Sequence, residues 1–304
     1  MITTVTLSPC IDKTVKTGKL NLDAMNRIEP VSLDIGGKGI NVSRALSRLG
    51  VRSRALGFNF SGGEAIPEAL EAEDVECRFT QCAGSLRTNL KIMETDIGRT
   101  VEINESNPCV SSENIENLKS AVARASKDSS MIVLAGSVPK GVGAGIYREL
   151  GEIAKEANPD IKVILDAQGV LLEEGLKAEP FMIKPNIFEL ETIIGKISSE
   201  DEIVSAARKL IAEYGVQVVL VSRGEDGAVI VSRDECYSHP AVKVPVKSTS
   251  GAGDSMVAGA ILALTKNLPL ESVLRYAVTA AAGAISHEGT TFCTEEEFER
   301  LLKL

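Results

Sequence analysis

The sequence predicts a single α/β domain of three layers, with helices on both faces of a mostly parallel central sheet and with a small β-sheet lid. Two patterns predict this fold. Short, nearly continuous apolar runs alternate with segments of helical periodicity, and strands covered on both faces have such runs. Two other regions break the alternation and indicate the lid. We treat residues 1–304 as one domain, because a chain of this length buries a large core.

Apolar runs rich in β-branched residues predict the strands of the central sheet. Between them, apolar residues recur at helical spacing, as in residues 40–49, which end at Gly50, and in residues 203–211. This alternation implies parallel strands joined by helical crossovers. Residues 227–246 are typical of a meander of short strands. The predicted strands of the parallel sheet lie at residues 2–7, 131–134, 163–166, 181–184 and 216–222.

The lid is predicted at residues about 12–35 and 87–107. The second of these regions alternates with period two on both sides of residues 96–98, which is typical of an antiparallel hairpin. We expect the two regions to form one small β-layer inserted into the main domain. A layer of this kind closes over a site and excludes water from the reacting groups.

The composition excludes several kinds of partner. Hydrophobic residues make up 44% of the chain and charged residues 25%, as in ordinary globular proteins. The net charge is -9 and no cluster of lysine and arginine stands out, so nucleic acid is not an expected partner. The two histidines lie far apart in the sequence, which argues against a histidine-rich zinc site.

The cysteines and the N-terminal residues predict a cytoplasmic protein. Six scattered cysteines form no Cys-x-x-Cys pair, so we expect reduced thiols and not a disulfide framework. The first residues lack the basic region and the cleavage signal of a secretion signal, and no apolar run is long enough to span a membrane. A membrane is therefore not an expected partner.

The most informative segment is a glycine-rich turn formed by Gly251, Ala252 and Gly253, which opens an apolar helix. The backbone N–H groups of a first helical turn are unpaired and hold anions. Asp254 lies in the same turn. A carboxylate beside an anion site suits a general base that takes a proton from an attacking hydroxyl. On spacing alone, a structural turn with Asp254 as a favourable helix charge is the alternative.

A second glycine-rich segment, residues 36–41, precedes a predicted helix. Gly37 lets a ligand approach the backbone closely, Lys38 suits a phosphate and Asn41 suits a hydroxyl. The segment is neither a Walker A loop nor a dinucleotide fingerprint, and a tight turn before a helix is the alternative. Asp12, at the end of the first strand, is well placed to accept sugar hydroxyls.

Residues 184–189 place polar groups after another predicted strand. Asn186 and Glu189 lie three residues apart, on one face of a helix. An amide and a carboxylate in this arrangement could hold magnesium through water. A helix N-cap followed by a first-turn acid is the alternative explanation.

Other polar segments also follow predicted strands, where α/β sheets bind ligands. Residues 222–227 suit nucleotide phosphates, or else a hairpin turn, and residues 136–139 lie beyond another strand. Arg87, Asn89 and Lys91 alternate along a predicted lid strand, so they project to one face. Two cations on one face suit a phosphate, and an exposed charged sheet face is the alternative.

Taken together, these segments resemble the ribokinase-like (PfkB) family of carbohydrate kinases over essentially the whole chain. Residues 36–41 resemble the family's N-terminal signature, residues 248–256 its C-terminal signature and residues 186–189 its Asn-x-x-Glu motif. Residues 6–12 are similar to the opening of the phosphofructokinase branch, with Ser8 in place of the usual asparagine. The family fold is a three-layer α/β/α sandwich with a β-lid, which agrees with the fold predicted from the residues.

The resemblance implies a role for each candidate residue. Asp254 would be the base, beside an anion hole formed by Gly251, Ala252 and Gly253. The cofactors would be ATP and Mg²⁺, and the partner a small sugar phosphate. The sugar phosphate would contact Asp12, Arg27, Gly37, Lys38, Asn41, Arg87 and Ser137, the nucleotide would contact Lys184, Asn186, Ser222, Gly224 and Gly227, and the metal would be held through water by Asn186 and Glu189.

The implied activity is phosphorylation of a ketohexose phosphate by ATP, with D-fructose 1-phosphate converted to fructose 1,6-bisphosphate. Tagatose-6-phosphate kinase is the alternative, and the pair Asn26-Arg27 looks more like that enzyme. A 6-phosphofructokinase and a non-catalytic sugar-phosphate sensor are further alternatives, because substrate choice in this branch depends on lid geometry that no motif encodes. The resemblance also implies a homodimer formed through the lids.

Overall fold

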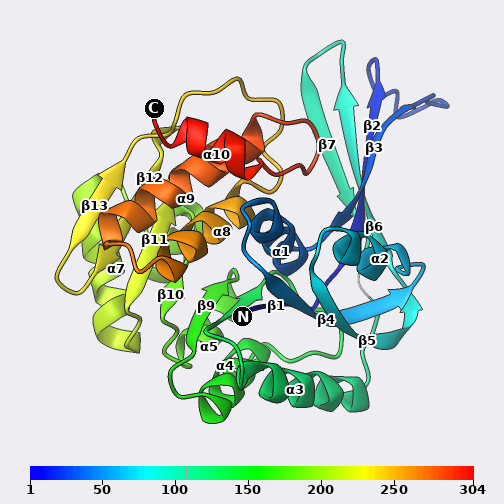
Figure 1. Ribbon diagram of the computed structural model, residues 1–304. Coiled ribbons are helices and arrows are strands. Elements are labelled where there is room, and N and C mark those ends of the chain that lie inside the picture. The colour runs from blue at the N-terminus through cyan, green and yellow to red at the C-terminus, as the bar shows by residue number, and fades with distance from the viewer. Residues whose placement is uncertain (107) are drawn as a thin grey trace.

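The computed structural model describes residues 1–106 and 108–304, and a nine-stranded sheet runs through the molecule (Figure 1). Its strands from β11 to β5 pair in parallel, and β12 and β13 add antiparallel pairs at one edge. This confirms the predicted mostly parallel sheet. In spatial order the strands are β13 (Cys236–His239), β12 (Ala228–Ser232), β11 (Val218–Ser222), β10 (Met182–Ile183), β9 (Lys162–Asp166), β8 (Met131–Ala135), β1 (Ile2–Thr6), β4 (Ser53–Ser61) and β5 (Glu76–Ser85).

Helices cover both faces of this sheet and complete three layers. Alternate residues of each strand serve two separate cores, so on β1 the side chain of Ile2 packs into one core and that of Val5 into the other. None of the helices in residues 1–106 and 108–304 is long and apolar enough to cross a membrane. One face carries α1 (Lys38–Arg48), α2 (Ala65–Ala72), α8 (Ala252–Thr265), α9 (Leu270–Ile285) and α10 (Glu295–Leu301), and the other carries α3 (Ser112–Ser126), α4 (Ile146–Ala157), α5 (Val170–Leu176), α6 (Ile187–Ile194) and α7 (Glu200–Tyr214).

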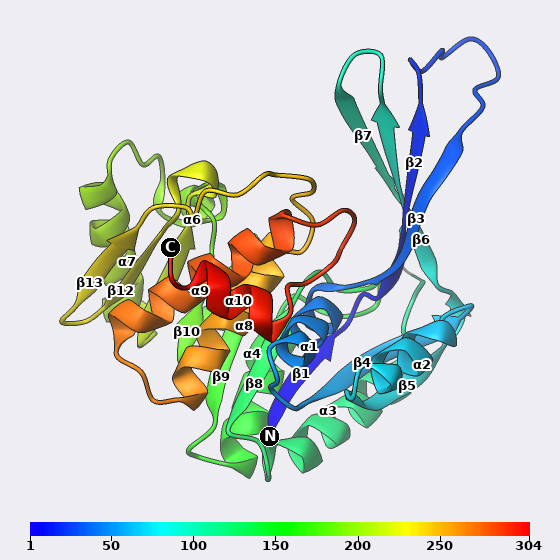
Figure 2. The same ribbon diagram turned by 45° about the horizontal axis from the view of Figure 1, so that its top comes forward.

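A smaller sheet of four strands rises away from the main body (Figure 2). In spatial order its strands are β3 (Glu29–Gly36), β2 (Cys10–Thr17), β6 (Arg87–Glu94) and β7 (Arg99–Asn104). β6 and β7 form the predicted antiparallel hairpin, whereas β2 and β6 pair in parallel, with Cys10 beside Arg87. β2 continues the chain from β1, and β6 continues it from β5. Residue 107, at the end of the second predicted lid region, lies outside the described residues.

Three segments differ from the sequence prediction. β4 and β5 were not expected, because Arg54 and Gly57 interrupt the apolar pattern of β4 and because β5 is a partly exposed edge strand with charged residues. The predicted meander at residues 227–246 ends with β13, and the chain after it forms no strand. Pro240 and Pro245 explain this end, since proline has no N–H group to donate to a sheet.

Candidate active site

The ends of four central strands and the starts of two helices meet at one edge of the main sheet. Parallel strands present their C-terminal ends at a common edge, where α/β proteins bind ligands. The residues that follow β1, β8, β9 and β10 lie at this edge, as do the first turns of α1 and α8. Gly37 precedes α1 with a φ of 126° and Gly251 precedes α8 with a φ of 76°, conformations that favour glycine.

Asp254 lies in the first turn of α8, and only 6% of its surface is exposed. Asn41 on α1 donates a hydrogen bond from its Nδ2 to Oδ2 of Asp254 at 2.8 Å. Burial raises the pKa of Asp254 to about 6, although Lys38 and the hydrogen bond from Asn41 favour its charged form. A carboxylate with this pKa is ionised at neutral pH and accepts a proton more readily than an ordinary one, which suits a general base.

Asp166, at the end of β9, is the centre of a charge cluster that the sequence predictions omit. Its Oδ1 lies 3.0 Å from Nζ of Lys38 and 3.4 Å from Nζ of Lys184, and its side chain is fully buried. Burial opposes ionisation of Asp166, but Lys184 and Lys38 hold its pKa below the usual range. Burial also opposes the charge on Lys38, whose pKa is nevertheless raised by Asp166 and Asp254. A positive charge therefore stays beside Asp254.

Asp166 has a recognisable sequence signal. It ends β9, and the three residues before it are apolar and buried. A carboxylate at the C-terminal end of a buried parallel strand points to the ligand-binding edge of the sheet and needs a cationic partner there. The apolar pattern of residues 163–166 by itself indicates only the strand.

The N-terminus of α8 is open to an anion. Among the residues that the structure describes, the N–H groups of Gly253 and Asp254 have no hydrogen-bond acceptor, as is usual in a first helical turn. Lys184 lies against the same turn, since a Cβ atom on Gly253 would be 3.3 Å from its Nζ. Two unpaired N–H groups and a buried ammonium group thus lie together, which is an arrangement that binds phosphate.

A cavity of about 250 Å³ lies beside Asn41 at the base of the smaller sheet. Arg87 there donates to Oδ1 of Asn89 at 2.8 Å and to the carbonyl oxygen of Ser8 at 3.3 Å. Asp12 lies on β2 and not at the end of β1, and it accepts a hydrogen bond from Asn89 at 2.8 Å. Six of the residues predicted to contact a sugar phosphate line this cavity, namely Asp12, Gly37, Lys38, Asn41, Arg87 and Ser137.

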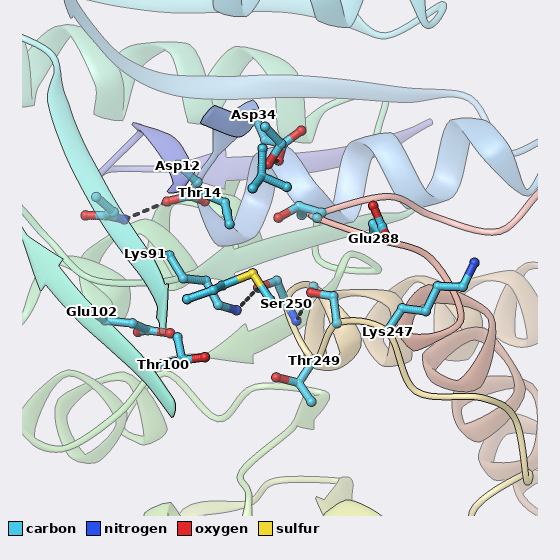
Figure 3. Close-up of a pocket in the computed structure, with 18 of the residues that line it drawn as sticks. Asp12, Thr14, Asp34, Lys91, Thr100, Glu102, Lys247, Thr249, Ser250 and Glu288 are labelled. Atoms are coloured by element: carbon cyan, nitrogen blue, oxygen red, sulfur yellow. Dashed lines mark hydrogen bonds between the residues drawn. The ribbon is translucent and has the colours of Figure 1, made fainter. Parts of the chain in front are cut away.

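A second cavity, of about 480 Å³, separates the smaller sheet from the loop that leads into α8 (Figure 3). Asp12, Asn41 and Asn89 line both cavities, so the two adjoin each other. Figure 3 shows Lys91 extending from β6 towards Ser250, to whose Oγ its Nζ donates at 3.4 Å. One face of the smaller sheet therefore covers both the sugar-phosphate candidates and the N-terminus of α8.

Comparisons with known proteins identify the family. The sequence pattern of the pfkB family of carbohydrate kinases matches residues 5–297. The chain belongs to that family. It is 36% identical to a 1-phosphofructokinase of Bacillus subtilis, over 99% of this chain and 97% of that protein. It is 31% identical to a tagatose-6-phosphate kinase of Staphylococcus epidermidis, over 100% of this chain and 98% of that protein.

Solved structures place this pfkB kinase in the expected fold. Phosphofructokinase-2 of Escherichia coli, in complex with substrates and products, matches it with a TM-score of 0.92 and 27% identity, over 99% of this chain and 98% of that chain. A ribokinase of Arabidopsis thaliana has the same fold, with a TM-score of 0.80 and 21% identity, over 100% and 98% of the two chains. The predicted family and the ribokinase-like α/β fold are thus confirmed, and the protein is a phosphotransferase with an alcohol group as acceptor.

Asn186 and Glu189 form a capping box at the start of α6 in this pfkB kinase. Oδ1 of Asn186 accepts from N–H of Glu189 at 2.7 Å, and Oε2 of Glu189 accepts from N–H of Asn186 at 2.9 Å. The described part of the chain holds no group of three or more His, Cys, Asp or Glu side chains that could bind a metal. Glu189 is nevertheless buried, and its charge favours the protonated form of Lys38. One amide and one carboxylate, each with an oxygen already engaged in the capping box, suit contact with Mg²⁺ through water.

The residues predicted to contact a nucleotide lie at the ends of β10 and β11 in this kinase. Lys184 and Asn186 follow β10, Ser222 ends β11, and Gly224 and Gly227 come after it. Ser222 forms an isolated parallel bridge with Asn186, which places this segment beside the start of α6. A Cβ atom on Gly227 would lie 2.0 Å from the carbonyl oxygen of His239, so the hairpin itself requires this glycine. A Cβ atom on Gly224 would have nothing within 4 Å, which leaves that position open to a ligand.

Arg27 stands apart from the other candidates in the pfkB kinase. It is exposed in the connection between β2 and β3, and it lines neither cavity. Its backbone carbonyl accepts a hydrogen bond from Oγ1 of Thr17 at 3.2 Å. Within one chain, the structure does not bring Arg27 to the residues that line the cavity of about 250 Å³.

Proposed function

We propose that this kinase transfers the γ-phosphoryl group of ATP to the 6-hydroxyl of D-fructose 1-phosphate and forms fructose 1,6-bisphosphate. One observation carries the proposal: a cavity with two cations, Lys38 and Arg87, adjoins a buried carboxylate, Asp254, through the shared residue Asn41. Relatives named 1-phosphofructokinase, at 31% to 36% identity, support the choice of sugar. We place the reaction in the cytoplasm, where the six free cysteines would stay reduced.

The sugar phosphate is held and activated by the smaller cavity in this proposal. Lys38 and Arg87 bind its phosphate through charge-assisted hydrogen bonds. Asp12 accepts hydrogen bonds from sugar hydroxyls. Asn41 orients Asp254 by its 2.8 Å hydrogen bond, and Asp254 takes the proton of the hydroxyl as the oxygen attacks.

Charge on the transferring group is stabilised at the N-terminus of α8. The N–H groups of Gly253 and Asp254 and the ammonium group of Lys184 lie where charge develops, and they need no rearrangement to act. Mg²⁺, held through water by Asn186 and Glu189, would add positive charge at the phosphate oxygens. The smaller sheet acts as the lid that keeps water away from the transfer.

A coupled assay of ADP release tests the proposal. With Mg-ATP, kcat/KM is compared for fructose 1-phosphate, tagatose 6-phosphate and fructose 6-phosphate. A preference for fructose 1-phosphate of about tenfold or more supports the proposal. A preference for fructose 6-phosphate assigns the enzyme as a 6-phosphofructokinase. If the folded protein releases ADP with none of the three sugars, the proposed substrate is wrong. Other sugars of the wider family are then tested, together with the alternative of a sugar-phosphate sensor.

Tagatose 6-phosphate is the second candidate substrate. Tagatose-6-phosphate kinases at 31% identity match 100% of this chain, which is the specific observation in its favour. Tagatose 6-phosphate differs from fructose 1-phosphate in the configuration of one hydroxyl and in the position of its phosphate, so its 1-hydroxyl would be the acceptor. A site that hydrogen-bonds a hydroxyl discriminates strongly against an altered one. A clear preference for this sugar in the same assay keeps the residues and the mechanism and changes the substrate.

The acid side of the pH profile should report Asp254. We expect kcat/KM, which reports the free enzyme, to fall as the pH is lowered through about 6, because burial raises the pKa of Asp254 to about 6 and only its ionised form accepts a proton. Asn41→Ala removes a hydrogen bond that favours the ionised form, so it should move this fall to higher pH. Steady-state profiles of both proteins check the prediction.

The comparison with Asn41→Ala also controls for the substrate, whose own phosphate titrates at a pH of about 6. A substrate ionisation would appear at the same pH in both proteins. If the activity of Asn41→Ala falls at the same pH as that of the wild type, the fall cannot be assigned to Asp254.

We further propose a homodimer formed through the smaller sheet. Apolar side chains are exposed on β3 and β7 and at the ends of the hairpins, and exposed apolar groups gathered on one surface are typical of an interface. A related phosphofructokinase-2 of Escherichia coli has been solved in a tetrameric inhibited form. The exposed residues are Leu22, Met25, Ile28, Val31, Leu33, Ile97 and Ile103.

Charge on this apolar surface should separate the dimer. Leu33→Glu combined with Ile103→Glu is expected to convert the dimer to a monomer in sedimentation velocity, because each introduced carboxylate would have to be buried without a partner. Val170→Glu is the matched control, since Val170 is also exposed but lies on α5 in the main body. A wild-type protein that sediments as a monomer would refute the dimer.

A further inference from the structure

Lys91 makes a contact that the proposed mechanism does not use. It lies on β6, half-buried, and donates from Nζ to Oγ of Ser250 at 3.4 Å across the second cavity (Figure 3). Ser250 directly precedes Gly251, the N-cap residue of α8. An ammonium group carried by the smaller sheet therefore ends beside the helix start where the N–H groups are unpaired.

Lys91 has an oppositely charged neighbour on its own sheet and does not pair with it. In the register of β6 and β7, Lys91 lies directly opposite Glu102, and both residues line the second cavity. Opposite charges in such cross-strand positions usually attract each other. In residues 1–106 and 108–304, however, Lys91 forms no ion pair, and its hydrogen bond goes to the neutral hydroxyl of Ser250.

The contact with Ser250 is weak for an ammonium group. Charge-assisted hydrogen bonds to anions are shorter than 3.4 Å and stronger than bonds to a neutral hydroxyl. Beside Ser250, the N–H groups of Gly253 and Asp254 are unpaired and Lys184 is adjacent. A terminal phosphoryl group bound there would offer Lys91 anionic oxygens in place of the hydroxyl.

We propose that Lys91 is a further catalytic residue, which leaves Ser250 and binds the terminal phosphoryl group of the nucleoside triphosphate. The inference rests on the proposed function. Lys184 reaches this group from the main body, whereas Lys91 arrives with the smaller sheet. The smaller sheet then supplies one of the positive charges that stabilise the transferring phosphoryl group. All of these charges surround that group only when the smaller sheet is closed over the site.

Nucleotide binding separates this role from a structural one. Lys91→Met removes the charge and keeps an unbranched side chain. We expect it to weaken binding of a non-hydrolysable ATP analogue by about tenfold to a hundredfold. Binding of ADP should change by less than about threefold, because ADP lacks the terminal phosphoryl group. Isothermal titration calorimetry with Mg²⁺ present measures both affinities.

Three other variants complete the binding experiment. Lys91→Arg keeps a positive charge and should recover part of the affinity for the analogue. Ser250→Ala removes the competing hydroxyl and should leave that affinity unchanged or raise it. Lys19→Met is the control for charge on the same sheet, because Lys19 is exposed between β2 and β3 and lines neither cavity.

The outcomes distinguish this proposal from the proposed function. In turnover assays, Lys91→Met should raise the KM for ATP by about the same factor as it weakens the analogue, and it should also lower kcat, because the charge acts on the transferring group as well as on the bound nucleotide. Sugar-phosphate binding should be unchanged. The role of Lys91 would be overturned if Lys91→Met lost equal affinity for ADP and for the analogue, or if its affinity for the analogue were unchanged. It would also be overturned if only the affinity for the sugar phosphate fell. Wild-type turnover with a ketohexose phosphate tests the proposed function separately and would stand in any of those cases.

Discussion

The Asp254→Asn variant is expected to lose about 10²- to 10⁴-fold in kcat and to keep its affinity for the sugar phosphate. Asparagine cannot take the proton of the attacking hydroxyl. It has nearly the size of aspartate, and its side-chain oxygen can still accept the hydrogen bond from Asn41. Initial rates at saturating substrate and calorimetric binding of the sugar phosphate check the two parts. A kcat within about threefold of the wild-type value would show that Asp254 is not the general base.

The same variant should be more stable than the wild type at alkaline pH. Burial raises the pKa of Asp254 to about 6 in the folded protein, compared with about 4 in an unfolded chain. The folded state therefore binds the proton more tightly, and the stability linked to this group falls as the pH rises from about 4 to about 6 and stays low above that. Asparagine does not ionise and escapes this loss.

Urea unfolding at about pH 8 and about pH 4 tests this direction of the pH dependence of stability. The variant should exceed the wild type at the higher pH, and the difference should shrink at the lower pH, where both side chains are neutral. Asp234→Asn is the control, because Asp234 is exposed and its replacement should give no such difference. A variant that is less stable than the wild type at about pH 8 would contradict the raised pKa.

The second large effect is expected on folding, from Asp166→Asn. This change removes the carboxylate that Lys38 and Lys184 share. Removing one partner of a buried ion pair typically costs about 3–5 kcal/mol. The side chain of Lys184 is only 5% exposed, whereas that of Lys38 is 36% exposed and can turn to water. We therefore expect a loss of about 3 kcal/mol in the free energy of unfolding, measured in urea.

A matched variant and a pH series test the role of Asp166. Asp128 also pairs with a buried cation, Arg54, but it is 62% exposed and Arg54 keeps Glu76 as a partner, so Asp128→Asn should cost less than about 1 kcal/mol. The pKa of Asp166 is held below its usual range, so its stabilisation is present above the unfolded pKa and is lost in acid. Equal stability of Asp166→Asn and the wild type at neutral pH would refute the prediction.

Much of the fold could be predicted because the buried strands have simple patterns. β8 and β9 carry short apolar runs that end where polar residues begin, and the structure contains both strands at the expected residues. β4 escaped prediction although nearly all of it is buried, since a paired arginine and a close approach of Gly57 to Thr6 are tertiary features. Burial of this kind depends on contacts that a local pattern does not record.

The candidate site could be predicted only as far as its local motifs extend. The glycine spacing at residues 251–254 predicts the turn, but spacing alone leaves a structural turn as an alternative to an anion site. The pairing of Asp166 with Lys38, and that of Lys91 with Ser250, join side chains more than a hundred residues apart in the sequence. Such pairs depend on the strand order of the sheet and on the position of the lid. The position of Arg27 could not be predicted from a local motif either, because the length of the hairpin between β2 and β3 keeps this residue away from the cavities.

The parallel pairing of β2 with β6 has a consequence for the order of folding. These strands continue β1 and β5, so Cys10 can meet Arg87 only after the chain between them has found its place. Contacts of this range form slowly, because the entropy of the connecting chain is lost before the contact is made. The main sheet holds β1 and β5 on either side of β4 and provides the two starting points. We therefore expect the small sheet to form last, so that a newly made chain becomes a kinase only at the final step of its folding.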